Sequence, residues 1–208
     1  MESTKIKTTV LQLIFASSVI FGIASCENKM KESDHTTSES ETKALTPDVA
    51  EDQNEGKFNK NDDEKNAAFL VKATEINLEE IGLGKLAQKK STNKDVKELG
   101  KMMETTHTKA LADLQKLAAK KSISIPTELP QDAKNAYDKL DGESEKDFNK
   151  NYADKMVSGH KDAIDLFEKQ STESSDEDIK TWATTMLPEL RTHLDHSIVV
   201  QKKIETLK

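Results

Sequence analysis

The chain has 208 residues, of which 33% are charged, 34% hydrophobic and 4% aromatic, with one cysteine, seven glycines and four prolines. A single cysteine excludes a disulfide framework and a multi-cysteine zinc finger. So few glycines, with no glycine-rich loop, argue against a nucleotide-binding α/β fold. Abundant Lys, Glu, Ala and Leu favour helices over strands, and the length predicts one domain plus extensions.

The negative charge is concentrated in one segment. The formal net charge is −7, and residues 27–64 hold twelve acids and five lysines, whereas residues 65–208 hold 25 acids against 24 bases. The C-terminal part is therefore nearly neutral and has no basic surplus that would neutralise phosphates. We expect no nucleic-acid partner.

The N-terminus has the features of a secretion signal. Lys5 and Lys7 precede an apolar run at residues 10–24, which is shorter than the about twenty residues of a membrane span and fits the apolar core of a signal peptide. The small residues before Cys26 look like a bacterial lipoprotein processing site. They predict a signal peptide at residues 1–25 and a lipidated cysteine that anchors the protein to a membrane of the cell envelope, facing the periplasm or the surface. An ordinary signal peptide and an uncleaved anchor are the alternatives.

Residues 26–64 are predicted to be an acidic, disordered tether. They are rich in Glu, Asp, Ser, Thr, Lys and Asn and have scarcely any large apolar side chain. Such a segment cannot bury enough surface to offset its chain entropy, and its like charges keep it extended.

From residue 65 onward the apolar residues recur at steps of three and four, the period of an amphipathic helix. The pattern predicts four helices, at residues 65–90, 93–121, 145–171 and 176–206. The long connection between the second and third helices contains Pro126 and Pro130 and a short helical pattern at residues 131–140; it either crosses the domain or folds back. Four long amphipathic helices bury their apolar stripes best as a bundle, so residues 65–208 are predicted to form an all-α, four-helix domain.

Each predicted long helix carries one ionisable side chain on its apolar stripe. These side chains are Glu80, His107, His160 and His193. Each lies near the middle of its helix, within about 4 Å of mid-height at 1.5 Å per residue. Because mid-height does not depend on the direction of a helix, we expect the four groups to meet in one layer.

Burying such a set without partners is costly. One solution is a transition metal, zinc or iron, held by neutral imidazoles and a carboxylate. The other is a layer that hydrogen-bonds to itself and to water. Helical spacing makes Glu104, three residues before His107, and Glu189, four before His193, candidates for outer partners of the imidazoles. Arg191, the only arginine, is a candidate for binding a carboxylate.

Four ordered groups of residues resemble the motifs of a bacterial family of unknown function with a ferritin-like fold. They are residues 66–73 with Glu80 and residues 83–87; residues 107–110; Tyr152, Met156, Val157, His160, Ala163 and residues 166–168; and Leu187, Pro188, Leu190, Arg191, His193 and Leu194. The resemblance covers about residues 66–198. It implies a ferritin-like bundle with the same four inward residues, and its members are often exported envelope proteins.

The chain also departs from that family. Members often carry an acid just before the histidines of the second and third helices, where this chain has Thr106 and Gly159. The chain lacks the two Glu-x-x-His motifs of carboxylate-bridged di-iron sites, and no serine or cysteine nucleophile lies in a recognisable motif.

No activity follows from the resemblance, so no catalytic residue is predicted and a binding protein is expected rather than an enzyme. The expectation is a lipid-anchored helical protein that binds a metal ion or small ligand through its Glu/His layer. The alternative is a structural or interaction module of the envelope without metal.

Overall fold

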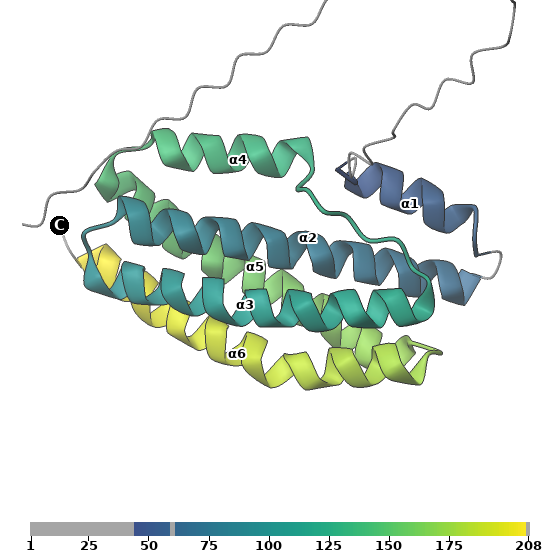
Figure 1. Cartoon of the computed structure of the whole chain (residues 1–208). Helices are drawn as coiled ribbons and strands as arrows, with labels where there is room; N and C mark the ends of the chain where they lie inside the picture. Colours follow the sequence, from purple (N-terminus) through teal and green to yellow (C-terminus); the bar gives the residue numbers. More distant parts are fainter. Residues whose placement is uncertain (1–43, 59–60, 207–208) are drawn as a thin grey trace, which may run out of the picture. The chain divides into compact units, whose positions relative to one another are not determined.

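The computed structural model describes residues 44–58 and 61–206, so the predicted signal peptide, Cys26 and the first part of the tether lie outside the described residues. In this part of the chain there are six helices and no strand, which confirms the all-α class (Figure 1). The helices are α1 (Pro47–Glu55), α2 (Asn61–Lys90), α3 (Lys94–Lys121), α4 (Gln131–Gly142), α5 (Glu145–Glu173) and α6 (Glu177–Thr206). None of these helices has the length and apolar content needed to cross a membrane.

The structure corrects the N-terminal boundary of the domain. The sequence predicts disorder up to residue 64, but α1 covers residues 47–55 and α2 begins at Asn61. The buried Asn54 side chain of α1 donates to the carbonyl of Ser124 at 2.8 Å and accepts from the backbone N–H of Ser124, also at 2.8 Å. This segment is ordered by a buried amide and by small side chains such as Ala50. The prediction of disorder from the polar composition of this segment was therefore wrong for residues 47–55 and 61–64.

Four long helices, α2, α3, α5 and α6, lie side by side (Figure 1). Links at residues 91–93 and 174–176 join α2 to α3 and α5 to α6, so each pair forms an antiparallel hairpin. The chain between the two hairpins includes α4, at the position of the predicted short helix, and runs back along the molecule. As a result α5 begins at the end of the molecule where α3 begins, and the two run in the same direction.

The apolar core consists of two clusters. Near one end, Leu70, Leu114 and Phe167 belong to the first cluster, which α2, α3, α5 and α6 all supply. Toward the other end, Met103 and Tyr152 belong to the second, again supplied by all four long helices. Along every long helix, the buried ionisable residue lies between the part that enters the first cluster and the part that enters the second. A polar layer therefore divides the core.

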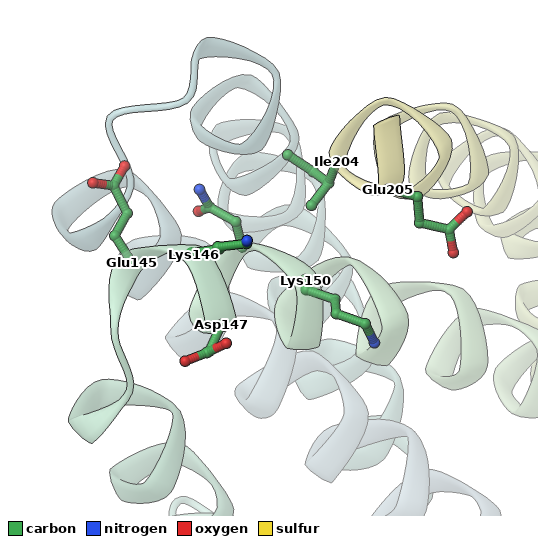
Figure 2. A pocket seen from close by; sticks show the side chains of 7 residues that line it. Glu145, Lys146, Asp147, Lys150, Ile204 and Glu205 are labelled. Carbon is green, nitrogen blue, oxygen red and sulfur yellow. The ribbon is translucent and has the colours of Figure 1, made fainter. Parts of the chain in front are cut away.

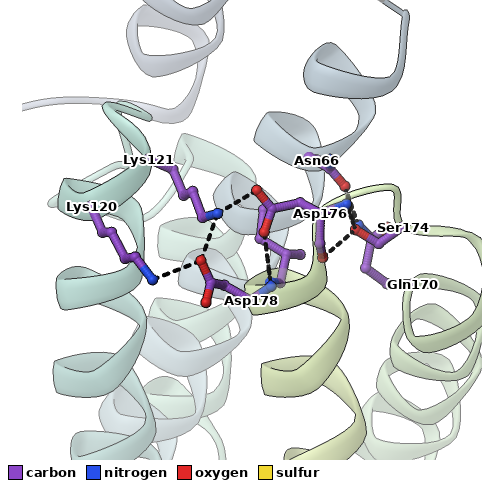
Figure 3. A network of polar contacts seen from close by, with 8 residues as sticks. Asn66, Lys120, Lys121, Gln170, Ser174, Asp176 and Asp178 are labelled. Carbon is purple, nitrogen blue, oxygen red and sulfur yellow. Dashed lines mark hydrogen bonds and ion pairs between the residues drawn. The ribbon is translucent and has the colours of Figure 1, made fainter.

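A polar network holds the helix ends together where α6 begins (Figure 3). The Lys121 ammonium, in the last turn of α3, lies 2.5 Å from a carboxylate oxygen of Asp176 and 2.7 Å from one of Asp178. The other oxygen of Asp176 accepts two backbone N–H groups of the first turn of α6, which satisfies donors that have no partner inside the helix. Nearby, Asn66 of α2 accepts a hydrogen bond from the Ser174 hydroxyl at 2.8 Å.

The α2 and α3 backbones touch at a pair of glycines. A Cβ atom on Gly84 would lie 2.5 Å from the carbonyl oxygen of Gly100 and 2.9 Å from the backbone nitrogen of Glu104. A Cβ atom on Gly100 would lie 2.7 Å from the carbonyl oxygen of Gly84. Because the obstructing atoms are backbone, neither side chain can be added without moving the helices apart.

We predict that Gly84→Ala destabilises the protein by about 2 kcal/mol or more, because overpacking at a backbone contact forces the helices to shift. The matched control is Gly142→Ala, where a Cβ atom would have no neighbour within 4 Å. Urea unfolding followed by circular dichroism measures both variants. Equal stability of the two variants would show that the glycine contact does not constrain the α2–α3 packing.

Candidate metal centre

Three buried histidines meet where the polar layer crosses the core. His107 of α3, His160 of α5 and His193 of α6 each offer one ring nitrogen, and these three nitrogens lie within 4.8 Å of one another. The side chains are almost fully buried, with 1–3% of their surface exposed. The rings are 5.2–5.8 Å apart between centroids. The structure thus brings together three of the four residues predicted for the layer.

The hydrogen atoms of two of these rings are located by their hydrogen-bond partners. The Asn77 amide nitrogen donates to the carbonyl of Ala73, so the Asn77 carbonyl oxygen, 3.0 Å from Nδ1 of His107, accepts a hydrogen from that ring. Nδ1 of His160 lies 2.8 Å from the carbonyl oxygen of Met156, which can only accept. A neutral imidazole carries one hydrogen, so in both rings Nε2 holds the lone pair.

His193 contacts a different partner with each of its nitrogens. Its Nε2 lies 3.1 Å from the Thr106 hydroxyl, and its Nδ1 lies 3.3 Å from Nε2 of His160. The Thr106 hydroxyl is also 2.9 Å from the carbonyl of Met102, to which it donates. When Thr106 donates there, it accepts from Nε2–H of His193, and Nδ1 of His193 is then a free lone pair facing Nε2 of His160.

In that arrangement Nδ1 of His107, Nδ1 of His160 and Nε2 of His193 each donate to an oxygen; we call these the outer nitrogens. The other nitrogen of each ring, the inner nitrogen, has a lone pair, and the three lone pairs share one space. Nε2 of His107 is buried and has no hydrogen-bond partner among the described residues. The 3.3 Å between the inner nitrogens of His160 and His193 is close to the roughly 3.4 Å that separates two nitrogens on a tetrahedral zinc ion. Oxygen acceptors on the outer nitrogens orient imidazoles for a metal.

Glu80 lies beside this cluster rather than within it. It is 6% exposed, and one carboxyl oxygen, Oε1, lies 4.0 Å from Nδ1 of His160, the nitrogen that bonds the Met156 carbonyl. Its other oxygen, Oε2, is buried without a hydrogen-bond partner among the described residues. The carboxyl group therefore approaches His160 from the side away from the inner nitrogens.

Two of the three predicted outer residues have other partners, and the third is exposed. Glu104 accepts a hydrogen bond from Gln88 at 2.7 Å, Glu189 is exposed, and the exposed Arg191 donates to Glu168 at 2.7 Å. No hydrogen bond within the described part of the chain joins any of these three to a histidine. Spacings of three or four residues place side chains on the same side of a helix, but neighbouring helices supply the nearer partners.

Sequence reasoning missed two partners of the imidazoles, Asn77 and Thr106. Asn77 carried a usable signal, because it lies four residues after Ala73 and three before Glu80 on the apolar stripe of α2. Thr106 carried none, since only the packing of α3 against α6 brings its hydroxyl to His193.

Burial sets the protonation state of the layer. It lowers the pKa of His107 well below its ordinary value of 6.5, and His193 and His160 act in the same direction. Burial also lowers the pKa of His160, and it lowers the pKa of His193 to about 3. For the Glu80 carboxyl group, burial raises the pKa from 4.5 to about 8. At pH 7 the imidazoles are therefore unprotonated, as metal ligands must be.

A separate cavity of about 430 Å³ lies where α5 begins and α6 ends (Figure 2). It is lined by residues such as Lys146, Lys150 and Ile204. None of the residues predicted from the sequence for the polar layer lines it, so the histidine cluster remains the better candidate for a functional site.

The fold and the site together define a helical protein whose core holds a buried three-histidine cluster. The family described as a domain of unknown function, DUF4142, matches residues 49–198, and the chain belongs to this family. The match confirms the resemblance to a family of unknown function and begins within α1, in agreement with the corrected domain boundary. Comparison with curated proteins and with solved structures gives no match.

We predict that the metal-free protein is most stable near pH 7, between the ordinary imidazole pKa of 6.5 and the raised pKa of Glu80, about 8. Below this pH the three unfolded imidazoles take up protons, while the folded chain keeps only the one on Glu80. Stability therefore falls with falling pH, by about 2.5 kcal/mol per unit near pH 5.5. Above pH 7 the unfolded imidazoles have lost most of their protons and the folded chain still holds the Glu80 proton, so stability falls with rising pH, by less than about 1.4 kcal/mol per unit.

Urea unfolding in chelator across pH 4.5–8.5 measures this profile. Glu80→Gln removes the titrating carboxyl group and should abolish the alkaline decline while the acid decline remains. A profile that is flat across the whole range would contradict burial of the imidazoles.

Proposed function

We propose that the protein binds one transition-metal ion, zinc or ferrous iron, through His107, His160 and His193. The observation that carries the proposal is the cluster of three buried ring nitrogens, one from each histidine, within 4.8 Å of one another. Asn77, Met156 and Thr106 place oxygens against the other ring nitrogens. When each of these oxygens accepts a ring hydrogen, every ring keeps one lone pair for an ion. Adjacent lone pairs repel unless a cation or a hydrogen lies between them, and neutral imidazoles are good ligands for zinc and iron.

We further propose a ferritin-like four-helix arrangement and a lipid anchor at Cys26. Two antiparallel hairpins joined by one long crossover support the ferritin-like arrangement. The lipid anchor is supported by the lysines, the apolar run and the small residues that precede the only cysteine. Under this proposal the protein is exported and is held at a membrane of the bacterial envelope, where it acts as a binding protein rather than an enzyme.

The alternative function is a metal-free structural module, and one observation favours it. If Nδ1–H of His193 donates to Nε2 of His160, and the Thr106 hydroxyl donates to Nε2 of His193 instead of to the Met102 carbonyl, both histidine contacts are satisfied without an ion. Within the described part of the layer, Nε2 of His107 and Oε2 of Glu80 then stay unpaired. In that case the layer would serve to fix the register of the helices.

Metal analysis of the full chain, purified in detergent and equilibrated with Zn²⁺ or Fe²⁺, distinguishes the two functions. We expect about one ion per chain in the wild type and less than a tenth of that in His107→Ala and His160→Ala, because each variant lacks one of three ligands. Asn77→Ala should bind about 10–100-fold more weakly, because the His107 ring loses its orienting acceptor.

The control for the metal analysis is His196→Ala, which should bind like the wild type. Circular dichroism checks that every variant is folded. A folded wild type that holds no metal, or ligand variants that hold as much as the wild type, would favour the structural module.

A further inference from the structure

A second cavity, of about 530 Å³, lies between α2, α4 and α5 on the Glu80 side of the layer. Its lining includes four carboxylates, from Glu75, Glu79, Asp132 and Asp162, and two lysine side chains. One lysine, Lys72, pairs with Glu75 at 2.7 Å, and the other, Lys155, pairs with Glu79 at 2.8 Å.

Two of these carboxylates, Asp132 and Asp162, enter no ion pair among the described residues. The lining therefore carries an excess of two negative charges, which favours cations over anions or neutral molecules.

Gly159 forms part of the wall of this cavity, and Glu80 lies directly behind it. A Cβ atom on Gly159 would have one neighbour within 4 Å, Oε1 of Glu80 at 3.6 Å. Glu80 does not itself line the cavity, and position 159 has no side chain to cover its carboxyl group. Oε2 of that group has no hydrogen-bond partner among the described residues, so the carboxyl group keeps an unused oxygen for a ligand that arrives through the wall.

Beyond Glu80 lies the histidine cluster. Oε1 of Glu80 is 4.0 Å from Nδ1 of His160, and His160 in turn contacts His193. From solvent inward, a cation would therefore meet exposed carboxylates, then one buried carboxyl group, then imidazoles. Because Glu80 faces the outer nitrogen of His160, the cation has to pass the edge of this ring to reach the inner nitrogens.

We propose that the α2–α4–α5 cavity is the route by which a divalent cation reaches the three-histidine centre, with Glu80 as a transfer ligand. This inference rests on the proposed function. Carboxylates suit a cation that is still partly hydrated, whereas imidazoles suit one that has lost most of its water. The gap at Gly159 keeps Glu80 within reach of the cavity.

The test is the rate of Co²⁺ uptake and release by the full chain in detergent, followed by visible absorption. Gly159→Ala places a methyl group against Glu80 and should slow uptake and release by the same factor, on the order of tenfold. The dissociation constant should stay the same, because the route changes while the site does not. Gly142→Ala is the matched control and should load at the wild-type rate.

Two charge variants test the outer part of the route. Asp162→Asn removes a lining carboxylate and should slow uptake about threefold at low ionic strength, with the difference disappearing in high salt. The control is Asp165→Asn, which removes an exposed carboxylate of the same helix that does not line the cavity; it should have no effect.

Glu80→Gln tests the transfer step and should slow uptake and release together. A weaker dissociation constant with unchanged uptake would instead make Glu80 a resident ligand and overturn the transfer role. Wild-type rates in Gly159→Ala would overturn the route. Absence of any Co²⁺ absorption in the wild type would overturn the metal centre itself, and this result is distinct from every change in rate.

Discussion

Three imidazoles and a carboxyl group are buried at one level between two apolar clusters, and the rest of the structure has to accommodate them. Each polar atom there needs a partner or has to remain unpaired at a cost in free energy. Asn77, Thr106 and the carbonyl of Met156 supply partners for the outer ring nitrogens. The inner nitrogens have no oxygen partner of this kind among the described residues. This difference between the outer and the inner nitrogens makes the layer a candidate site rather than an ordinary buried polar network.

The layer depends on the helices keeping their register. Gly84 and Gly100 bring α2 and α3 into backbone contact, two turns from Asn77 and His107 along their respective helices. A helix that shifted by one residue would rise about 1.5 Å and break the 3.0 Å contact between these side chains. The glycine contact and the polar layer therefore support each other, although the glycines take no part in the chemistry of the site.

The sequence predicted the parts of the structure that depend on periodicity. The four long helices and the short one follow from the spacing of apolar and turn residues, and the positions of His107, His160 and His193 near mid-helix predicted their meeting. Periodicity predicts which face of a helix a residue lies on. It does not predict the rotamer of a histidine ring or which residue of another helix is nearest to it. For this reason the predicted acidic partners of the imidazoles were replaced by an amide, a hydroxyl and a carbonyl group. The helix α1 was missed for a related reason, because its order comes from contacts of polar and small residues with a distant segment.

The pairing of the long helices into two hairpins has a consequence for the order of folding. Each hairpin closes a link of a few residues, so its contacts are local and form fast. Glu80 and His107 belong to the first hairpin, whereas His160 and His193 belong to the second, so the layer is complete only after the two hairpins have docked. Where docking of the hairpins follows the transition state of folding, interactions in the layer act mainly on the unfolding rate. Substitutions in the layer then shorten the lifetime of the native state more than they slow its formation.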